Sequence, residues 1–225
     1  MRERRRRREK AAGTSSNNIP SAVLFAEGYE AALRGLEEKM RDCPDLVRRR
    51  LVLPGGEAML FFLDGLVDRD LLQRDLLTPL SSSPETVLAD PSVLPVAEWH
   101  EETLLQEAVE RLFYGFALLV VKDRPSALAF AFKGWKERTL DEPEVERNIR
   151  GAHEGFTEDL STNMAILRRR LRTPQLKFKQ LKLGKRAPSR FCLAYLEDLV
   201  SPEILARLAE RLARIDLDVV QSPSY

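Results

Sequence analysis

The sequence predicts an α/β protein built from two small subdomains, each a mixed, mostly antiparallel sheet with packed helices. Two hairpin patterns, over residues 51–63 and 116–133, alternate with helical patterns in the first half. Another pair of strand patterns follows residue 175 and lies between two further helices. One helix, two strands, a helix and the start of a strand are too few for a finished layer, so we expect the second subdomain to be truncated.

Residues 1–21 are predicted to form a disordered basic tail. The first ten residues carry six Arg and one Lys against two Glu, and a small, polar stretch follows them. Such a segment buries too little apolar surface to offset the entropy of ordering. The net charge of +1 therefore combines a basic start with an acidic remainder.

The first subdomain is predicted over residues 22–136 and opens with one amphipathic helix over 22–40. Apolar residues recur there at three- and four-residue steps, at Phe25, Tyr29, Leu33 and Leu36. Strands over 51–53 and 58–63 flank Pro54-Gly55-Gly56, and glycines supply the positive φ angles of a tight turn. We therefore expect a hairpin directly after the helix.

The rest of the first subdomain alternates helices with a second hairpin. The pattern predicts a short helix over 68–77, a long polar loop over 81–95 and a helix over about 101–113. Strands over 116–122 and 127–133 then flank a turn at 123–126.

A charged segment over 137–153, which contains Pro143, is the predicted hinge between the subdomains. The second subdomain, 154–225, begins with a helix over 156–171, whose acidic start and basic end suit the helix dipole. Strands over 176–183 and 191–196 follow, with a bulge expected near Gln180 because the apolar alternation shifts there. Ser201 and Pro202 then open a last helix.

No motif predicts an enzyme. Neither a phosphate-binding loop nor a nucleophile elbow is present. His100 and His153 lie in polar, acid-rich stretches typical of solvated side chains, and Cys192 is expected to be a small buried residue of a strand. Two cysteines and two histidines make no disulfide framework or metal cluster. We therefore predict no cofactor and no metal, and a reducing cytoplasmic setting.

The apolar runs are too short for a membrane-spanning helix. The longest, over 112–121, has ten residues, whereas a helix that crosses a bilayer needs about 20. The chain as given is therefore expected to be soluble.

A block of positive charge is the most unusual feature. No Asp or Glu occurs between Ser161 and Leu196, and ten Lys or Arg residues lie within the 23 positions 168–190. Besides Arg168 and Arg170, the predicted basic face contains Arg169, Arg172, Lys177, Lys179, Lys182, Lys185, Arg186 and Arg190. Such a face suits nucleic-acid phosphates, anionic lipids or an acidic protein. Alternatively, about half of these cations pair with the carboxylates of 142–158 within the fold.

The nearby aromatic residues disfavour nucleic acid as the partner. Binding of single strands ordinarily uses exposed aromatic rings for base stacking. Only Phe178 and Phe191 lie near the basic block, and their alternation places them in the core.

Several segments closely resemble the amino-terminal cytoplasmic domain of the GerA family, the A subunits of bacterial spore germinant receptors. The resemblance covers roughly residues 45–225, and the segments that carry it are 62–68, Trp135-Lys-Glu-Arg138, 142–144, 149–172, the turn at Gly184, Tyr195 and 211–218. The family usually has Pro and Arg where this chain has Ala152 and His153, and a more Thr-rich turn at 187–189. These departures would soften the hinge and shift its charge.

The resemblance implies a non-enzymatic role in nutrient-triggered spore germination. It implies a bundle of membrane helices downstream of this region, and B and C subunits as partners. It also implies the inner spore membrane as the location, with this region on the cytoplasmic, core side. An anionic membrane surface is a further possible partner of the basic residues.

We hypothesise that the segment 150–172 transmits or anchors conformational change between the subdomains and neighbouring subunits. A hinge that leads into a charged helix end can have two discrete pairings. The candidate contact residues are Arg150, Gly151, Glu154, Gly155, Phe156, Glu158, Asn163, Arg168 and Arg170. Alternatively, Arg150, Glu154 and Asn163 only satisfy the backbone of the loop. The rival functions are a nucleic-acid-binding or small-molecule-binding module that uses the basic face 168–190.

Overall fold

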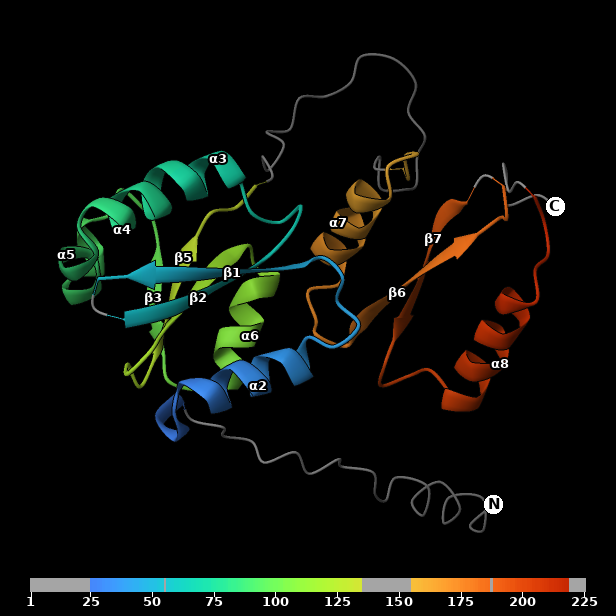
Figure 1. Cartoon of the computed structure of the whole chain (residues 1–225), viewed down its shortest axis with the longest axis horizontal. Coiled ribbons are helices and arrows are strands. Elements are labelled where there is room, and N and C mark those ends of the chain that lie inside the picture. The colour runs from blue at the N-terminus through green and yellow to red at the C-terminus, as the bar shows by residue number, and fades with distance from the viewer. Residues whose placement is uncertain (1–24, 55, 135–154, 187, 219–225) are drawn as a thin grey trace, which may run out of the picture.

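The computed structural model describes residues 25–54, 56–134, 155–186 and 188–218. They form a larger five-stranded part, residues 25–134, and a smaller two-stranded part, residues 155–218 (Figure 1). The predicted tail over 1–21 and the predicted hinge over 137–153 lie outside the described residues. The mixed α/β class with antiparallel sheets is confirmed.

The five-stranded sheet is antiparallel throughout and has the order β1-β2-β4-β5-β3. Its strands are β1 (Leu46–Leu53), β2 (Gly56–Leu63), β3 (Trp99–Glu102), β4 (Phe116–Val121) and β5 (Ala127–Ala131). Both predicted hairpins are confirmed, and β1 begins five residues earlier than expected. Gly56 lies opposite Leu53 and closes the first hairpin. Its φ is 147°, a backbone conformation that residues other than glycine rarely adopt.

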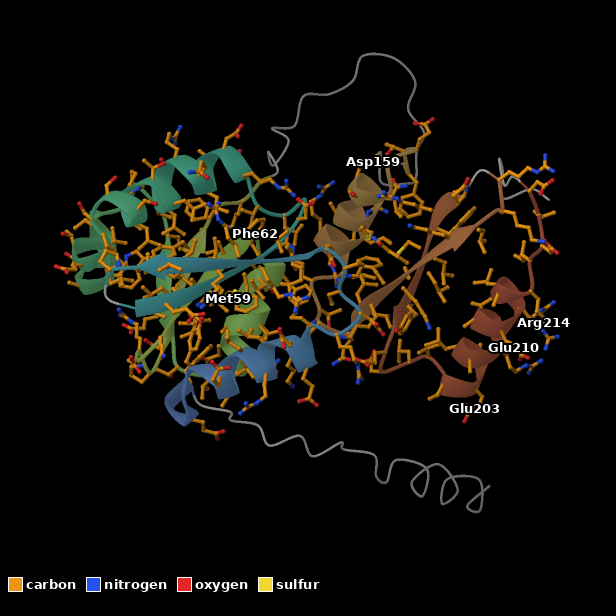
Figure 2. The ribbon with its side chains drawn as sticks, viewed as in Figure 1. Met59, Phe62, Asp159, Glu203, Glu210 and Arg214 are labelled. Carbon is orange, nitrogen blue, oxygen red and sulfur yellow. The ribbon has the colours of Figure 1, made fainter. Side chains whose placement is uncertain are left out.

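Helices cover both faces of this sheet (Figure 1). α2 (Tyr29–Lys39) and α6 (Leu105–Phe113) pack on one face, and α3 (Arg69–Leu72), η2 (Gln73–Leu77), α4 (Thr78–Ser82) and α5 (Pro84–Ala89) pack on the other. Two apolar clusters result, and Met59 and Phe62 of β2 belong to opposite ones (Figure 2). Because β4 is buried on both faces, its sequence is an unbroken apolar run.

Three expectations for the five-stranded part were wrong in detail. The helix over 22–40 is divided at Gly28, whose φ of 101° separates η1 (Phe25–Glu27) from α2. The expected loop over 81–95 contains α5 and η3 (Pro91–Val93), since Pro84 and Pro91 occupy the first positions of these two helices. β3 was missed, and two of its four residues, Glu101 and Glu102, fall where the start of a helix was expected; α6 begins only at Leu105.

A wide helical turn also lengthens the expected helix over 68–77 to Ser82. Pro79 has no N–H group, and in a regular α-helix its ring would clash with the carbonyl of Asp75. The segment Gln73–Leu77 adopts a π-helical turn, in which the Thr78 N–H donates to the Gln73 carbonyl five residues earlier. This wider turn lets the helix pass the proline without ending.

The two-stranded part contains α7 (Leu160–Arg170), β6 (Leu176–Leu183), β7 (Ser189–Leu196) and α8 (Pro202–Ala213). The strands pair without interruption from Leu176 opposite Leu196 to Leu183 opposite Ser189, so the bulge expected near Gln180 was wrong. The apolar alternation shifts for another reason. Leu176 and Phe178 face α7, whereas Leu181 and Leu183 face the opposite side of the strands.

The core of the two-stranded part is small. Met164, Leu176 and Phe178 form it, and α8 buries none of its residues. Glu203 and Glu210 lie on α8, and Arg214, which directly follows the helix, forms an ion pair with Glu210 (Figure 2). The apolar cluster of this part shares no residue with the two clusters of the five-stranded part.

Candidate functional site

A buried ion pair joins the two parts of the molecule. The side chain of Arg168, in the last turn of α7, is 0% exposed, and that of Asp45, which precedes β1, is 2% exposed. The Nε of Arg168 donates to one carboxylate oxygen of Asp45 at 2.7 Å, and Nη2 donates to the other at 2.9 Å. Its Nη1 donates to the carbonyl of Leu176 at 2.6 Å. The charged group is therefore neutralised by a two-point contact and a third hydrogen bond.

Two aromatic rings, one from each part, contact the same guanidinium group. Its central carbon lies 5.1 Å from the ring centroid of Phe113 in α6 and 4.5 Å from that of Phe178 in β6. At these distances a cation is attracted to an aromatic face, most strongly where water is excluded. Burial disfavours the charged form of Arg168, but the hydrogen bonds and charge of Asp45 outweigh this and raise its pKa above the ordinary value.

Cys43 lies beside the ion pair and is also buried. Burial raises the pKa of its thiol, and the nearby positive charges of Arg168 and Lys177 act in the opposite direction. The raised pKa favours the neutral thiol. Burial likewise raises the pKa of Cys192, which packs against the small apolar cluster of the two-stranded part.

Polar contacts surround this centre and extend the junction to β6 and β7. The Lys177 ammonium donates to the carbonyl of Lys39 at 2.9 Å, and the Phe178 N–H donates to the carbonyl of Asp42 at 2.8 Å. The Tyr195 hydroxyl donates to the carboxylate of Asp42 at 3.0 Å. Asp42 has a φ of 54°, a left-handed conformation that aspartate tolerates better than most residues.

One close steric contact completes the junction. Gly65, in the turn after β2, has a φ of 78°, and a Cβ atom added to it would lie 2.6 Å from the Cβ of Ala165 in α7. Only a glycine therefore allows α7 to approach this turn. An open depression of about 450 Å³ lies beside the junction and includes Cys43, Asp42, Phe178 and Lys179 in its lining.

The predicted basic face is divided by the fold. Arg168 is buried at the junction, and its carboxylate partner is Asp45 rather than a residue of 142–158. Lys177 is 3% exposed, so it does not lie on an exposed face as predicted. Arg169 is half-buried, and the exposed cations of the predicted face and contact set are Arg170, Arg172, Lys179, Lys182, Lys185, Arg186 and Arg190.

Several of the exposed cations have partners. Lys185 and Arg186 form ion pairs with Asp216 and Asp218. The guanidinium of Arg172 lies over the ring of Tyr114, at 5.3 Å from its centroid. Part of the basic block is therefore engaged in contacts within the fold.

Of the other predicted contact residues, those that the structure describes lie just before α7 or in its first turns. Gly155, Phe156 and Glu158 are exposed. The side-chain oxygen of Asn163 accepts from the Thr157 N–H at 2.7 Å, and its amide donates to the Thr157 carbonyl at 2.7 Å. Asn163 thus satisfies the backbone of the loop, as the alternative interpretation expected. Arg150, Gly151 and Glu154 lie outside the described residues.

Asp45, Cys43 and Phe113, which complete the site around Arg168, were not predicted from the sequence. One signal could have indicated that Arg168 is buried, because it lies one helical turn after Met164, within the apolar stripe of α7. Nothing local in the sequence identifies Asp45 as its partner.

Within the described ranges, no group of His, Cys, Asp and Glu side chains could hold a metal ion. Over the same residues, none of the helices combines the length and the apolar character that a membrane crossing needs.

A family model described as the Bacillus/Clostridium GerA spore germination protein matches residues 34–225. Spore germination protein GerLA of Bacillus cereus is 28% identical over 198 residues, which are 84% of this chain and 40% of that protein. Spore germination protein B1 of Bacillus subtilis (strain 168) is 32% identical over 167 residues, or 72% of this chain and 35% of that protein. The chain thus spans about two fifths of the length of these relatives.

A solved structure has the same fold. It is the crystal structure of the N-terminal domain of the A subunit of the Bacillus megaterium spore germinant receptor GerK3, and it superposes with a TM-score of 0.69 at 20% sequence identity. The alignment covers 87% of this chain and 74% of that one.

Proposed function

The chain belongs to the GerA family of spore germination proteins, and we propose that it is the N-terminal region of an A subunit of a spore germinant receptor. In this role it takes part in nutrient-triggered germination through conformational coupling and subunit contacts, without catalysing a reaction. The observation that carries the proposal is the family match over residues 34–225. The fold shared with the GerK3 domain agrees with it.

The proposed coupling element is the junction around Arg168 and Asp45. A buried ion pair fixes the geometry between the groups that carry it, because a shift of either partner leaves an uncompensated charge. Arg168 is attached to α7, and Asp45 to the hairpin of β1 and β2. A displacement of one part is thereby passed to the other as a discrete change rather than a gradual bend.

The remaining features of the proposal concern organisation and location. We propose a first subdomain over 22–136, a hinge over 137–153 and a second subdomain over 154–225. The partners would be the B and C subunits of the receptor and a membrane domain of the same protein. The location would be the inner spore membrane, with this region on the core side.

A complementation experiment tests the proposed function. The gene is deleted from the native spore former and replaced by the parent sequence, by Arg168→Glu or by the control Lys182→Gln, which alters an exposed cation. Arg168→Glu places a second carboxylate beside Asp45, so these spores should lose the response that the parent restores. Germination is followed as the fall in optical density after nutrient addition, with the level of each protein checked by immunoblot.

Two outcomes would contradict the proposal. In the first, spores that lack the gene respond normally to every nutrient tested. In the second, Arg168→Glu spores with parental protein levels germinate like the parent. The first outcome would reject the receptor role, and the second would reject the junction as the coupling element.

A further inference from the structure

Several of the contacts that join the two parts of the molecule are made by polar groups. The apolar clusters lie within each part, and none of them crosses the junction. The contacts that cross it include the ion pair of Asp45 with Arg168, the hydrogen bond of Tyr195 with Asp42 and that of Lys177 with the Lys39 carbonyl. Water can replace each of these partners, whereas it cannot replace an apolar core. Polar interfaces of this kind between units of one chain permit relative motion.

We propose that the junction is a latch with two states, closed in this structure and open when Arg168 separates from Asp45 while both parts remain folded. The latch consists of Asp45 and Arg168 together with the two rings on the guanidinium, Phe113 and Phe178. The inference concerns the equilibrium of the chain itself, so it does not depend on the proposed role in germination.

The chemistry of the pair favours two states over a continuous range. A small separation of Arg168 from Asp45 removes the two-point contact while both groups are still shielded from water, which is the most costly arrangement. A larger separation hydrates the guanidinium and the carboxylate, and it frees the carbonyl of Leu176 to bind water as well. Intermediate positions are therefore less favourable than either end state.

Two further residues of the junction, Gly65 and Cys43, allow the separation of the two parts to be induced and to be measured. Gly65 lets α7 sit directly against the turn after β2, so a side chain at this position would hold the parts apart without altering any charge. Cys43 borders both the ion pair and the open depression, and it is buried in the closed state. Opening of the latch should therefore expose the Cys43 thiol to a small reagent.

Alkylation of Cys43 measures the opening directly. The experiment uses the 225-residue chain with Cys192→Ser, which leaves Cys43 as the single thiol. The rate of modification by N-ethylmaleimide is followed by mass spectrometry over a range of urea concentrations below the unfolding transition. In this parent we expect slow labelling with a weaker urea dependence than global unfolding shows, because opening exposes less surface.

Two changes that act by different means should favour the open state. Asp45→Asn weakens the pair, and Gly65→Ala inserts a Cβ atom that collides with Ala165. Each should raise the labelling rate of Cys43 by about tenfold or more, because the rate follows the population of the open state. The matched control is Leu76→Ala, a cavity in the cluster on the far face of the sheet, which should lower global stability without changing the labelling rate.

Three results would overturn the latch. In the first, Cys43 of the parent reacts as fast as an unhindered thiol. In the second, the labelling rate of Cys43 has the full urea dependence of global unfolding. In the third, Leu76→Ala would accelerate labelling as much as Asp45→Asn and Gly65→Ala do. A spore phenotype plays no part in these readouts, so a failed receptor role and a failed latch are distinguishable.

Discussion

Arg168 shows how a charged residue can occupy the centre of a junction. Its side chain is fully buried, yet each group around it offers the guanidinium a favourable contact: a carboxylate, a carbonyl oxygen and two aromatic faces. Burying an unpaired charge would cost several kcal/mol. The pair therefore contributes mainly to the uniqueness of the arrangement, and the removal of one member is more harmful than the removal of both.

Substitutions at the pair test this asymmetry. Asp45→Asn should lower the free energy of unfolding by about 3 to 5 kcal/mol, because it leaves the buried guanidinium without a counter-charge. The double variant Asp45→Leu with Arg168→Met should stay within about 2 kcal/mol of the parent, since it removes both charges and loses chiefly the bond to Leu176. Urea unfolding followed by circular dichroism gives both values. A double variant as unstable as Asp45→Asn would contradict this explanation.

Tyr195 links the stability of the junction to alkaline pH. Burial, followed by the hydrogen bond and charge of Asp42, raises its pKa to about 12. The pKa of an unfolded tyrosine is about 10, so the contribution of Tyr195 to stability is complete below about pH 10 and is lost as the pH rises towards 12. Between pH 9.5 and about 11.5, the parent should therefore lose more stability in urea than Tyr195→Phe does. Equal losses in the two proteins would refute this linkage.

At the residue scale, the sequence indicates which side chains are unusual but not which ones meet. The run of cations in 168–190 marks Arg168 as a candidate. Its partner Asp45 lies 123 positions away and looks like an ordinary acidic residue before a strand. The cation–ring contacts with Phe113 and Phe178 depend on three different elements. Such pairings follow from tertiary structure, which no local pattern contains.

At the scale of elements, α7 is held in place by its start as well as by its end. The carboxylate of Asp159 accepts from the Thr162 N–H at 2.7 Å and from the Thr162 hydroxyl at 2.6 Å. These hydrogen bonds lower the pKa of Asp159 and satisfy an otherwise free N–H at the helix start. The start of the helix that carries Arg168 in its last turn is therefore capped.

Two glycines with positive φ provide a matched test of the contact between α7 and β2. Gly65→Ala should lower the free energy of unfolding through its strained φ of 78° and through the collision with Ala165. Gly28 has a φ of 101°, and a Cβ atom added to it would meet no atom within 4 Å. Gly28→Ala should therefore show only the conformational cost, about 1 to 2 kcal/mol. Urea unfolding should show the larger loss for Gly65→Ala. Ala165→Gly in the same chain should recover part of it, and a lack of recovery would argue against the collision.

Elements with long, regular patterns were predictable, and short ones were not. The hairpins of β1 with β2 and of β4 with β5 follow from apolar runs around turn residues. β3 has only four residues, and its acidic sequence Trp-His-Glu-Glu resembles a helix start more than a strand. Pairing with β5 makes it a strand, which shows tertiary context overriding local preference.

For the whole molecule, the described core is very unevenly distributed. The five-stranded part encloses two large apolar clusters, whereas the cluster of the two-stranded part has three buried members. An isolated pair of strands is marginal in water. We therefore expect the smaller part to depend on its contacts with the larger one.

Separate fragments test this dependence and the proposed division of the chain. A fragment of residues 22–134 should unfold cooperatively in urea, because it keeps both large clusters. A fragment of residues 155–225 should show a broad transition and bind an apolar dye, because α8 and the small cluster bury too little surface. A sharp, independent transition of the smaller fragment would show that it needs no support from the junction.

The separation of Asp45 and Arg168 along the chain has a consequence for the newly made protein. The two residues are 123 positions apart, and a ribosome adds roughly 5 to 20 residues per second, so Asp45 precedes its partner by about 6 to 25 s. The β1–β2 hairpin and the larger clusters can close within that interval, while the carboxylate still faces water. Each molecule thus begins with a hydrated junction surface, and α7 must displace that water when it arrives.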